Sequence, residues 1–338
     1  MNRVQSLYES ILFYYDLYPG KIEDYGKVKK ITTNRGIFAL KETMMTPHQA
    51  DEFIHSLRKL TKLGFNQSVP IYPTKFGEYI LSIDSQMYYL MPWIEATEYT
   101  AKESREEKLA SQLGVIHRLT VETVPFLREN IDESFQQLVK IWEMRRLDLN
   151  RFADLAERKT YMSPFELTFL THAHMLDRMA ENAQEHLQKW YDLCIEKGRY
   201  RTVLCHGRMQ RSHALFSPDN EPLLLNFERA SIDTPARDIA NFCMFSFPNA
   251  YWTEEEVVKW FMRYERHLPL LEDEKHLICA YLNFPEPISY VVEVYATNRE
   301  SMSELEHVQR LEKRLTSMRK VQRLTQKLII TQDQEHSS

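Results

Sequence analysis

Glycine is scarce in this chain, and its scarcity limits how the backbone can hold a ligand. Only 8 of the 338 residues are glycine, about 2.4% against an average near 7%. Glycine lets a backbone wrap closely around phosphate groups. Neither G-x-G-x-x-G nor G-x-x-x-x-G-K-[ST] occurs in the sequence. The common glycine-rich phosphate-binding loops are therefore excluded.

Paired cysteines and long apolar runs are also missing. Four cysteines are present, widely spaced and without a C-x-x-C pair: Cys194, Cys205, Cys243 and Cys279. This spacing indicates reduced thiols in a protein made in the cytoplasm, not a disulfide framework or a zinc site. No stretch is long enough to span a membrane, and Glu9 and Asp16 interrupt the apolar N-terminal segment, unlike a signal peptide. The net charge of −5 gives no indication of a nucleic-acid partner.

The residues that are present predict a folded α+β protein with two lobes. Hydrophobic residues make up 43% of the chain and aromatic residues 12%, which is typical of a chain with a sizeable core. Period-two and period-3.6 patterns near the N-terminus predict, in order, a helix over 3–17, strands over 27–33 and 36–43, a helix from Thr46 to about Gly64, and strands over 78–83 and 87–93.

Helical periodicity dominates from about residue 103 onward. The predicted helices cover 103–123, 133–157, 164–197 and several segments from Pro235 to about 330, with short strands between 203 and 227. We therefore expect a β-rich N-terminal lobe over 1–95, a helical C-terminal lobe over 96–331 and a disordered tail over 332–338.

Two neighbouring segments carry a resemblance to known enzymes. CHGRMQRSHALF (205–216) is followed by LLLNFERASIDTPARDIANF (223–242). Together they resemble the H-G-D-x-x-x-x-N, I-D-F and D-x-A signature of the aminoglycoside phosphotransferase and choline kinase superfamily. Lys41, in FALKET, stands where such kinases place a phosphate-binding lysine, and MPWIE, with Met91 and Trp93, resembles the hinge that receives adenine. The resemblance implies a two-lobe, protein-kinase-like fold over about 20–330.

The chain is similar, more narrowly, to the CotS-type coat proteins of endospore-forming bacteria, and among them to the YutH-like members. The features that suggest this are the helix before the first hairpin, the LKET strand ending, and the two long helices before the 205–216 loop. The resemblance implies synthesis in the mother-cell cytoplasm, assembly into the spore coat, and other spore coat proteins as partners.

Three residues differ from the signature at its catalytic and metal-binding positions. Arg208 stands at the position of the catalytic carboxylate, His213 at the metal-binding amide and Asn226 at the metal-binding aspartate. Arginine cannot accept a proton, and imidazole is a poor ligand for magnesium. Each lost negative charge at about 6 Å weakens Mg²⁺ binding by on the order of 5 kcal/mol before screening. We expect no intact catalytic residue, no metal site and no cofactor.

Other residues near these positions have possible roles in the loop and in nucleotide binding. Lys41 could retain its phosphate-facing place, paired with Glu52 on the following helix. If the segment after Asn226 is extended, Glu228 points to the same face as Asn226, and it could act as a substitute acid. We expect His206 to brace the loop, and Asp238 to fix the loop or to cap the helix from Pro235.

Positive charge near the loop allows two interpretations. Arg208, Arg211 and His213, with Lys41, could form a cationic pocket that holds a phosphate or carboxylate without metal. Alternatively, the arginines pair with Glu228 or other acids and close the site.

The last predicted helix also allows two interpretations. An apolar stripe from Leu305 to Met318 lies opposite a basic face. The stripe could pack on the rest of the protein and leave the basic face to solvent. Alternatively, residues 305–330 could dock an acidic partner.

Three hypotheses for function follow. The first is a catalytically inactive kinase-like protein that is a structural or assembly component of the spore coat. The second is a small-molecule phosphotransferase of the aminoglycoside, choline or homoserine kinase kind, with displaced catalytic residues and a need for ATP and Mg²⁺. The third is a module that binds a nucleotide or another anion without metal.

Overall fold

The computed structural model describes residues 3–95, 97–125, 127–248 and 250–335, and the chain divides into two compact units. The first unit combines residues 1–109 with 206–231, and the second combines 110–205 with 232–338. The expected lobes, 1–95 and 96–331, are each one continuous stretch. Contacts instead group residues 206–231 with the N-terminal segment, because Ser68 and Leu224 form a β-bridge and Phe227–Arg229 packs against the helix over 47–62.

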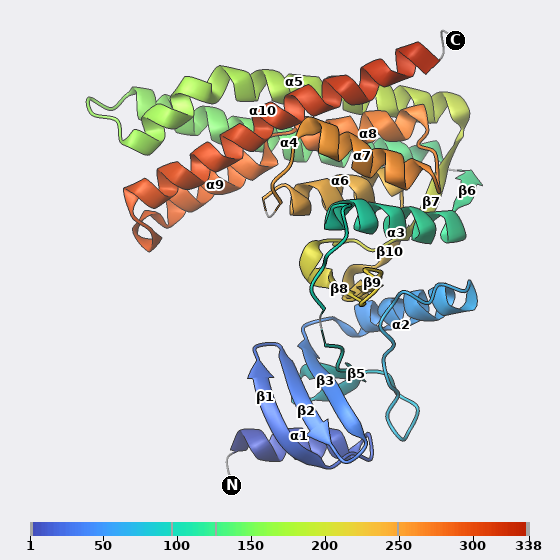
Figure 1. Ribbon diagram of the computed structural model, residues 1–338. Helices are drawn as coiled ribbons and strands as arrows, with labels where there is room; N and C mark the ends of the chain where they lie inside the picture. Colours follow the sequence, from blue (N-terminus) through green and yellow to red (C-terminus); the bar gives the residue numbers. More distant parts are fainter. Residues whose placement is uncertain (1–2, 96, 126, 249, 336–338) are drawn as a thin grey trace. The chain divides into compact units, whose positions relative to one another are not determined.

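The first unit is built on a five-stranded antiparallel sheet with the order β1-β2-β3-β5-β4 (Figure 1). Its strands are β1 (Pro19–Tyr25), β2 (Val28–Thr33), β3 (Gly36–Thr43), β4 (Leu81–Ile83) and β5 (Gln86–Pro92). Four of these confirm predicted strands, and β4 is shorter than expected. The sequence gives no signal for β1, whose side chains are mostly polar. As an edge strand it is defined by its pairing with β2 and not by burial.

Two helices accompany this sheet. Helix α1 (Arg3–Phe13) places Ile11 and Leu12 in a cluster with Leu40 and Leu90 of the sheet. Helix α2 (Pro47–Lys62) begins at Thr46, whose hydroxyl accepts a hydrogen bond from the amide of Gln49 while the Gln49 side chain accepts one from the amide of Thr46. This reciprocal cap and the proline at the first helical position confirm the predicted start.

The remaining part of the first unit is the segment over 206–231. It contains a short hairpin of β8 (Ala214–Phe216) and β9 (Pro222–Leu224) and two 3₁₀ turns, η1 (Arg211–His213) and η2 (Phe227–Arg229). Gly207 has a φ of +74°, and a Cβ added there would overlap the carbonyl oxygen of Arg229. Only glycine allows this close approach of the loop to η2.

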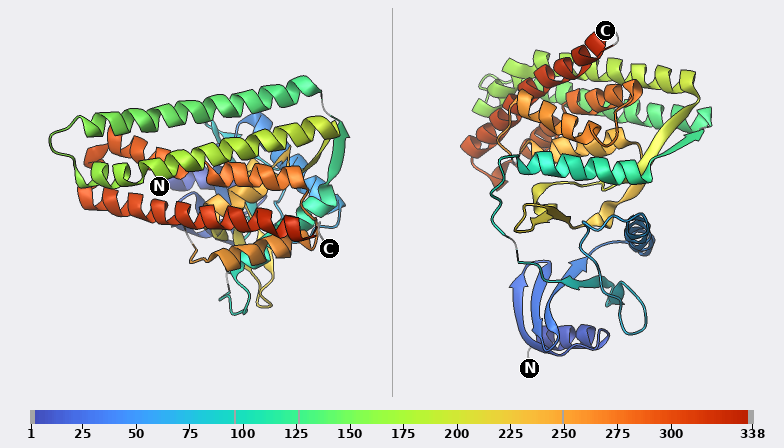
Figure 2. Two further views of the ribbon diagram at one scale, coloured as in Figure 1. Left: turned by 90° about the horizontal axis from the view of Figure 1, so that it is seen from above. Right: turned by 45° about the vertical axis from the view of Figure 1, so that its right-hand side comes forward.

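The second unit is mostly helical, with one small sheet of order β10-β7-β6. Its strands are β6 (Glu122–Pro125), β7 (Arg199–Cys205) and β10 (Ser231–Asp233). Its helices are α3 (Arg105–Thr120), α4 (Arg128–Glu157), α5 (Pro164–Lys197), α6 (Pro235–Ser246), α7 (Glu254–Glu265), α8 (Glu272–Asn283), α9 (Glu286–Thr297) and α10 (Glu304–Glu335), with the 3₁₀ turn η3 (Arg299–Ser301) before α10. The long helices α4, α5 and α10 run side by side (Figure 2).

Helix α5 has the predicted bounds because both of its ends are encoded locally. Ser163 and Glu166 form a reciprocal cap at its start. Gly198 ends it with a φ of 62°, a left-handed conformation that glycine adopts without strain. Between these ends, Phe165 stacks on Tyr295 of α9 with ring centroids 3.9 Å apart.

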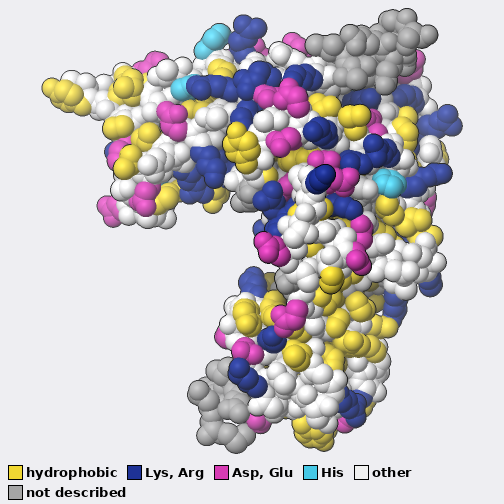
Figure 3. Space-filling model, viewed as in Figure 1, with side chains coloured by type: hydrophobic (Ala, Val, Ile, Leu, Met, Phe, Trp, Pro, Cys, Tyr) yellow, Lys and Arg dark blue, Asp and Glu magenta, His cyan; other side chains and the backbone are white. Residues whose placement is uncertain are grey.

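Helix α10 packs on the rest of the second unit, as the first interpretation of this segment expects. The predicted stripe is buried at Leu311, Leu315 and Met318 and continues through Val321 and Leu324, but Leu305, expected at its start, is exposed. Two of its basic side chains have partners within the unit: Arg323 donates to Glu254 at 2.6 Å and Lys320 donates to the carbonyl oxygen of Trp252 at 2.8 Å. On the face shown in Figure 3, positive and negative side chains are interspersed over this unit. Residues 332–335, expected in a disordered tail, belong to the helix, and 336–338 lie outside the described residues.

In the described part of the chain, no helix is long and apolar enough to cross a membrane. The four cysteines are buried and form no disulfide.

Candidate functional site

Lys41 is the centre of a buried polar cluster in the first unit. Its Nζ lies 2.8 Å from Oε1 of Glu228 and also donates to Oδ1 of Asn226. Tyr89 lies opposite Lys41 in the pairing of β3 with β5, and its hydroxyl donates to Oε1 of Glu228 at 2.8 Å. Thr43 gives the same carboxylate a further hydrogen bond. The strand register therefore places three hydrogen-bond donors next to the carboxylate of Glu228.

The partner of Lys41 differs from the predicted one. Glu52 lies on an exposed face of α2, where half of its side chain meets solvent and its nearest ionic partner is His48. Lys41 points away from this face, since only 10% of its side chain is exposed. The prediction of a Lys41–Glu52 pair is therefore wrong, and Glu228 takes that place.

Glu228 reaches Lys41 through a turn and not through an extended strand. Asn226 adopts the left-handed conformation, with φ 64° and ψ 45°, which asparagine tolerates better than most residues. The chain then enters the 3₁₀ turn η2. The expected extended geometry is therefore wrong, but Asn226 and Glu228 still present oxygen atoms to the same ammonium group.

The side-chain oxygen atoms that could serve as metal ligands in this cluster are already occupied. The oxygen atoms of Asn226 and Glu228 both contact the Lys41 ammonium, so a divalent cation would have to displace it. Burial raises the pKa of Glu228, but the charge of Lys41 and hydrogen bonds from Lys41, Tyr89 and Thr43 outweigh burial and lower it overall. Burial lowers the pKa of Lys41 and the charge of Glu228 opposes this. The two groups thus stabilise each other.

The loop over 206–213 is held by hydrogen bonds that occupy both of its histidines. His206 donates from Nε2 to the carbonyl oxygen of Leu225 at 2.9 Å and accepts at Nδ1 from the amide of Arg208 at 3.3 Å. His213 donates from Nδ1 to the carbonyl oxygen of Arg208 at 2.7 Å, and its Nε2 is 2.9 Å from Nε2 of Gln210. With both ring nitrogens engaged, neither histidine offers a lone pair to a metal ion.

His213 makes the stability of the protein depend on pH. Burial lowers the pKa of His213 to about 4, and the charges of His206, Arg208 and Lys41 add to the effect. The unfolded chain binds this proton near pH 6.5, so the stabilisation is complete above that pH and is lost as the pH falls toward 4. When the pH falls from 7 to 5, the free energy of unfolding should decrease in the unmodified protein because of His213. In His213→Asn this decrease should be smaller by about 2 kcal/mol. Urea denaturation at both pH values measures this difference.

The control for this measurement is His174→Asn, because His174 is exposed on the surface of α5. This variant should keep the pH dependence of the unmodified protein. Equal pH dependence in all three proteins would contradict the buried, neutral state of His213.

Three of the four basic groups considered for a cationic pocket are paired or neutral. The Arg211 guanidinium binds the carboxylate of buried Glu106 through Nε and, at 2.9 Å, through Nη2. Lys41 is paired with Glu228, and the lowered pKa of His213 keeps it neutral at pH 7. Of the two interpretations, these contacts favour the one in which acids neutralise the basic side chains.

The predicted adenine hinge lies at the end of β5. Met91 is paired with Ala39 inside the sheet and is half-buried. Trp93 donates its indole N–H to Glu95 at 2.9 Å, and Nζ of Lys30 lies 4.7 Å from the centroid of its ring. Trp93 thus packs against side chains of its own sheet.

Asp238 belongs to a buried cluster in the second unit. Its carboxylate accepts a hydrogen bond from Nε2 of His117 at 3.1 Å, and Nδ1 of His117 lies 2.8 Å from the hydroxyl of Tyr264. The cap of α6 is Thr234, not Asp238, so the capping alternative is wrong. His117 has both of these partners within the second unit.

The sulfur of Cys205 lies close enough to His117 and Asp238 for the three to form a metal-ligand set. However, His117 is hydrogen-bonded at both nitrogens, and burial raises the pKa of the Cys205 thiol. We therefore interpret the three residues as a hydrogen-bonded part of the protein core and not as a metal site.

The fold is that of small-molecule phosphotransferases. An aminoglycoside phosphotransferase from Alicyclobacillus acidocaldarius is 19% identical with a TM-score of 0.79, and the match covers 97% of this chain and 96% of that one. A spectinomycin phosphotransferase, solved with ADP and spectinomycin, is 15% identical with a TM-score of 0.60, over 91% and 93% of the two chains. An amicoumacin kinase is 10% identical with a TM-score of 0.58, over 94% of each. At these identities the likeness establishes the fold alone.

No curated protein matches the chain. A family model described as "spore coat putative kinase YutH" matches residues 8–328, a range that includes Lys41, the loop over 206–213 and Glu228. The chain therefore belongs to the YutH family of spore coat putative kinases.

Proposed function

We propose that this protein is a catalytically inactive member of the kinase-like fold that serves as a structural or assembly component of the spore coat. The observation that carries the proposal is the ion pair between buried Lys41 and half-buried Glu228. In this pairing the lysine that would hold a nucleotide's phosphates and the acid that could replace a lost metal ligand neutralise each other. Membership of a spore coat family supports the location and makes other coat proteins the expected partners.

Phosphoryl transfer requires an acceptor hydroxyl oriented by a carboxylate and a metal ion held against the phosphates. Arg208 can supply only hydrogen-bond donors at the first position. At the position expected for the metal ion, Asn226 and Glu228 already contact Lys41. A nucleotide phosphate that reached Lys41 would have to displace Glu228 and leave a carboxylate buried without its partner, at a cost of several kcal/mol. These contacts disfavour both the phosphotransferase hypothesis and the hypothesis of a metal-independent nucleotide-binding module.

ATP is expected neither to be turned over nor to bind. With ATP and Mg²⁺, release or transfer of the γ-phosphate should not exceed that of the double variant Lys41→Ala/Glu228→Gln, which removes both charges together and so leaves no unpaired one. ATP, with or without Mg²⁺, should not raise the melting temperature of the protein. A radiolabelled ATP assay and a thermal-shift titration measure these two quantities.

Each other outcome would identify a different function. Turnover above the double variant, and lost in Glu228→Gln, would show a phosphotransferase with relocated residues. A rise in melting temperature that does not depend on Mg²⁺ would show a nucleotide-binding module. The coat role has its own readout: the protein should be found in coat extracts of purified spores, and its absence from them would contradict that part of the proposal.

A further inference from the structure

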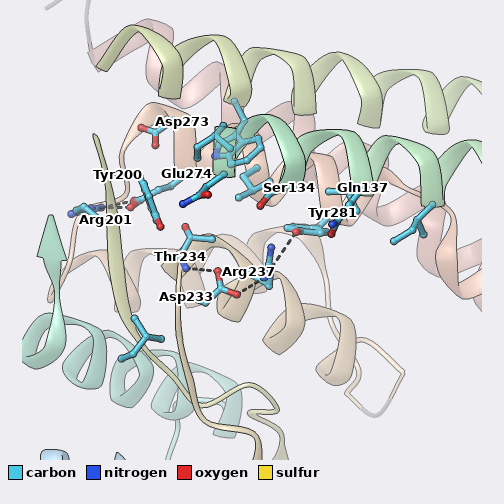
Figure 4. A pocket seen from close by; sticks show the side chains of 17 residues that line it. Ser134, Gln137, Tyr200, Arg201, Asp233, Thr234, Arg237, Asp273, Glu274 and Tyr281 are labelled. Carbon is cyan, nitrogen blue, oxygen red and sulfur yellow. Dashed lines mark hydrogen bonds and ion pairs between the residues drawn. The ribbon is translucent and has the colours of Figure 1, made fainter. Parts of the chain in front are cut away.

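The second unit contains a cavity of about 540 Å³ that plays no part in the proposed function. Its walls come from α4, α5, α6, α8, β7 and the end of β10 (Figure 4). All of its lining residues belong to the second unit, so it is independent of the Lys41 cluster. Its volume lies within the range of small-molecule sites, roughly 300–1,000 Å³.

The charged groups in the cavity wall are already paired. Arg201 binds both oxygen atoms of Glu274, with Nε 2.8 Å from Oε1. Arg237 binds Asp233, as Figure 4 shows. The third acid of the wall, Asp273, receives the ammonium of Lys197. Every carboxylate in the wall therefore has a basic partner, and these groups together carry no net charge.

This pairing disfavours charged ligands. An anion could bind Arg201 or Arg237 only by displacing its carboxylate partner, and a cation could reach a carboxylate only by displacing a guanidinium or an ammonium group. Removing one partner of a half-buried or buried ion pair costs several kcal/mol because the other charge is left unpaired. The cavity is thus better matched to a neutral ligand.

The remaining lining groups are neutral hydrogen-bonding side chains, aromatic rings and aliphatic side chains, the last being Ile131, Leu138, Ile141, Ile232 and Leu277. Helix α4 presents Ser134 and Gln137, which face Thr234 and Arg237 across the cavity in Figure 4. Both α4 residues are exposed, so their polar atoms are accessible to a ligand. Three aromatic side chains of the wall are half-buried and keep part of their surface accessible: Trp190, Tyr200 and Tyr281.

We propose that this cavity is a binding site for an uncharged, polyhydroxylated ligand of the carbohydrate class. A sugar ring has hydroxyl groups that can donate to and accept from amide and hydroxyl side chains. It also has apolar C–H faces that pack on aromatic rings. The cavity offers hydrogen-bonding side chains and aromatic rings, and its charged side chains are already in ion pairs.

The test uses the full chain and four soluble probes. Maltose and N,N′-diacetylchitobiose are neutral saccharides, glucose 6-phosphate is anionic and spermidine is cationic. Saturation-transfer NMR should detect binding of at least one neutral saccharide, and titration of that saccharide gives its dissociation constant. Gln137→Trp, which places an indole at the cavity, should weaken that binding at least tenfold.

The matched control is Gln136→Trp, the same substitution one residue earlier on α4 at an exposed position outside the cavity. It should leave the dissociation constant unchanged. Ser134→Trp, one turn before Gln137, should also weaken saccharide binding. This second variant keeps the test valid if Gln137→Trp fails to fold. The proposal is overturned if neither saccharide binds, if a charged probe binds in preference to both, or if Gln137→Trp and Ser134→Trp bind as well as Gln136→Trp.

Discussion

Replacing Gly207 with alanine should prevent the 206–231 segment from closing against itself. The new Cβ would overlap the carbonyl oxygen of Arg229, a backbone atom that cannot rotate away. The φ of +74° adds strain for any residue with a side chain. We expect a loss of about 4 kcal/mol or more in the free energy of unfolding, which places this substitution among the most damaging kinds. Urea denaturation followed by circular dichroism measures it.

The variant Gly26→Ala separates the effect of backbone strain from the effect of the steric overlap. Gly26 has the same φ, +74°, but no other atom lies within 4 Å of the position of its Cβ. This variant therefore carries the backbone strain without the overlap, and should cost about 1 kcal/mol. If the two alanine variants were equally stable, the close approach of Gly207 to Arg229 would be refuted.

Removing either partner of the Lys41–Glu228 pair should destabilise the protein by about 3–5 kcal/mol. Lys41→Met leaves the Glu228 carboxylate buried with only Tyr89 and Thr43 as donors, and Glu228→Gln leaves the ammonium without an opposite charge. The double variant Lys41→Met/Glu228→Gln should be more stable than either single variant, because no unpaired charge remains. Urea denaturation of the four proteins at pH 7 gives the coupling energy of the pair.

The control is the pair formed by Lys30 and Glu95, which has the same separation of 2.8 Å. The Glu95 side chain is 73% exposed, so solvent screens the interaction and the corresponding variants should change stability little. Additive effects of Lys41→Met and Glu228→Gln would mean that the two charges do not interact, and the basis of the proposed inactivity would fail.

Sequence patterns located the elements whose ends are encoded locally. The cap at Thr46, followed by proline, predicted the start of α2. Helical periodicity predicted the bounds of α5, whose ends lie at Ser163 and Gly198. The two-lobe α+β plan and the family were predicted from the same patterns and from the 205–216 segment. Strand β1 was missed because an edge strand with polar side chains has no burial pattern of its own.

The site was only partly predictable. The sequence singled out Lys41, Asn226, Glu228 and the loop histidines, but paired Lys41 with Glu52. The contribution of Tyr89 was missed, although it could have been found by setting β3 against β5 in register. Nothing in the sequence indicates that Arg211 pairs with Glu106, since the two residues are far apart in the chain.

By itself, the sequence determined which chemical groups stand at the positions that match the phosphotransferase signature. A guanidinium at Arg208 and an amide at Asn226 hold for any conformation, because residue type fixes charge and the capacity to accept a proton. Only the tertiary structure decided what the remaining groups do. Lys41 pairs with Glu228, and the acids of the second unit's cavity with nearby bases, because burial makes an unpaired charge costly and the fold selects which partner is within reach.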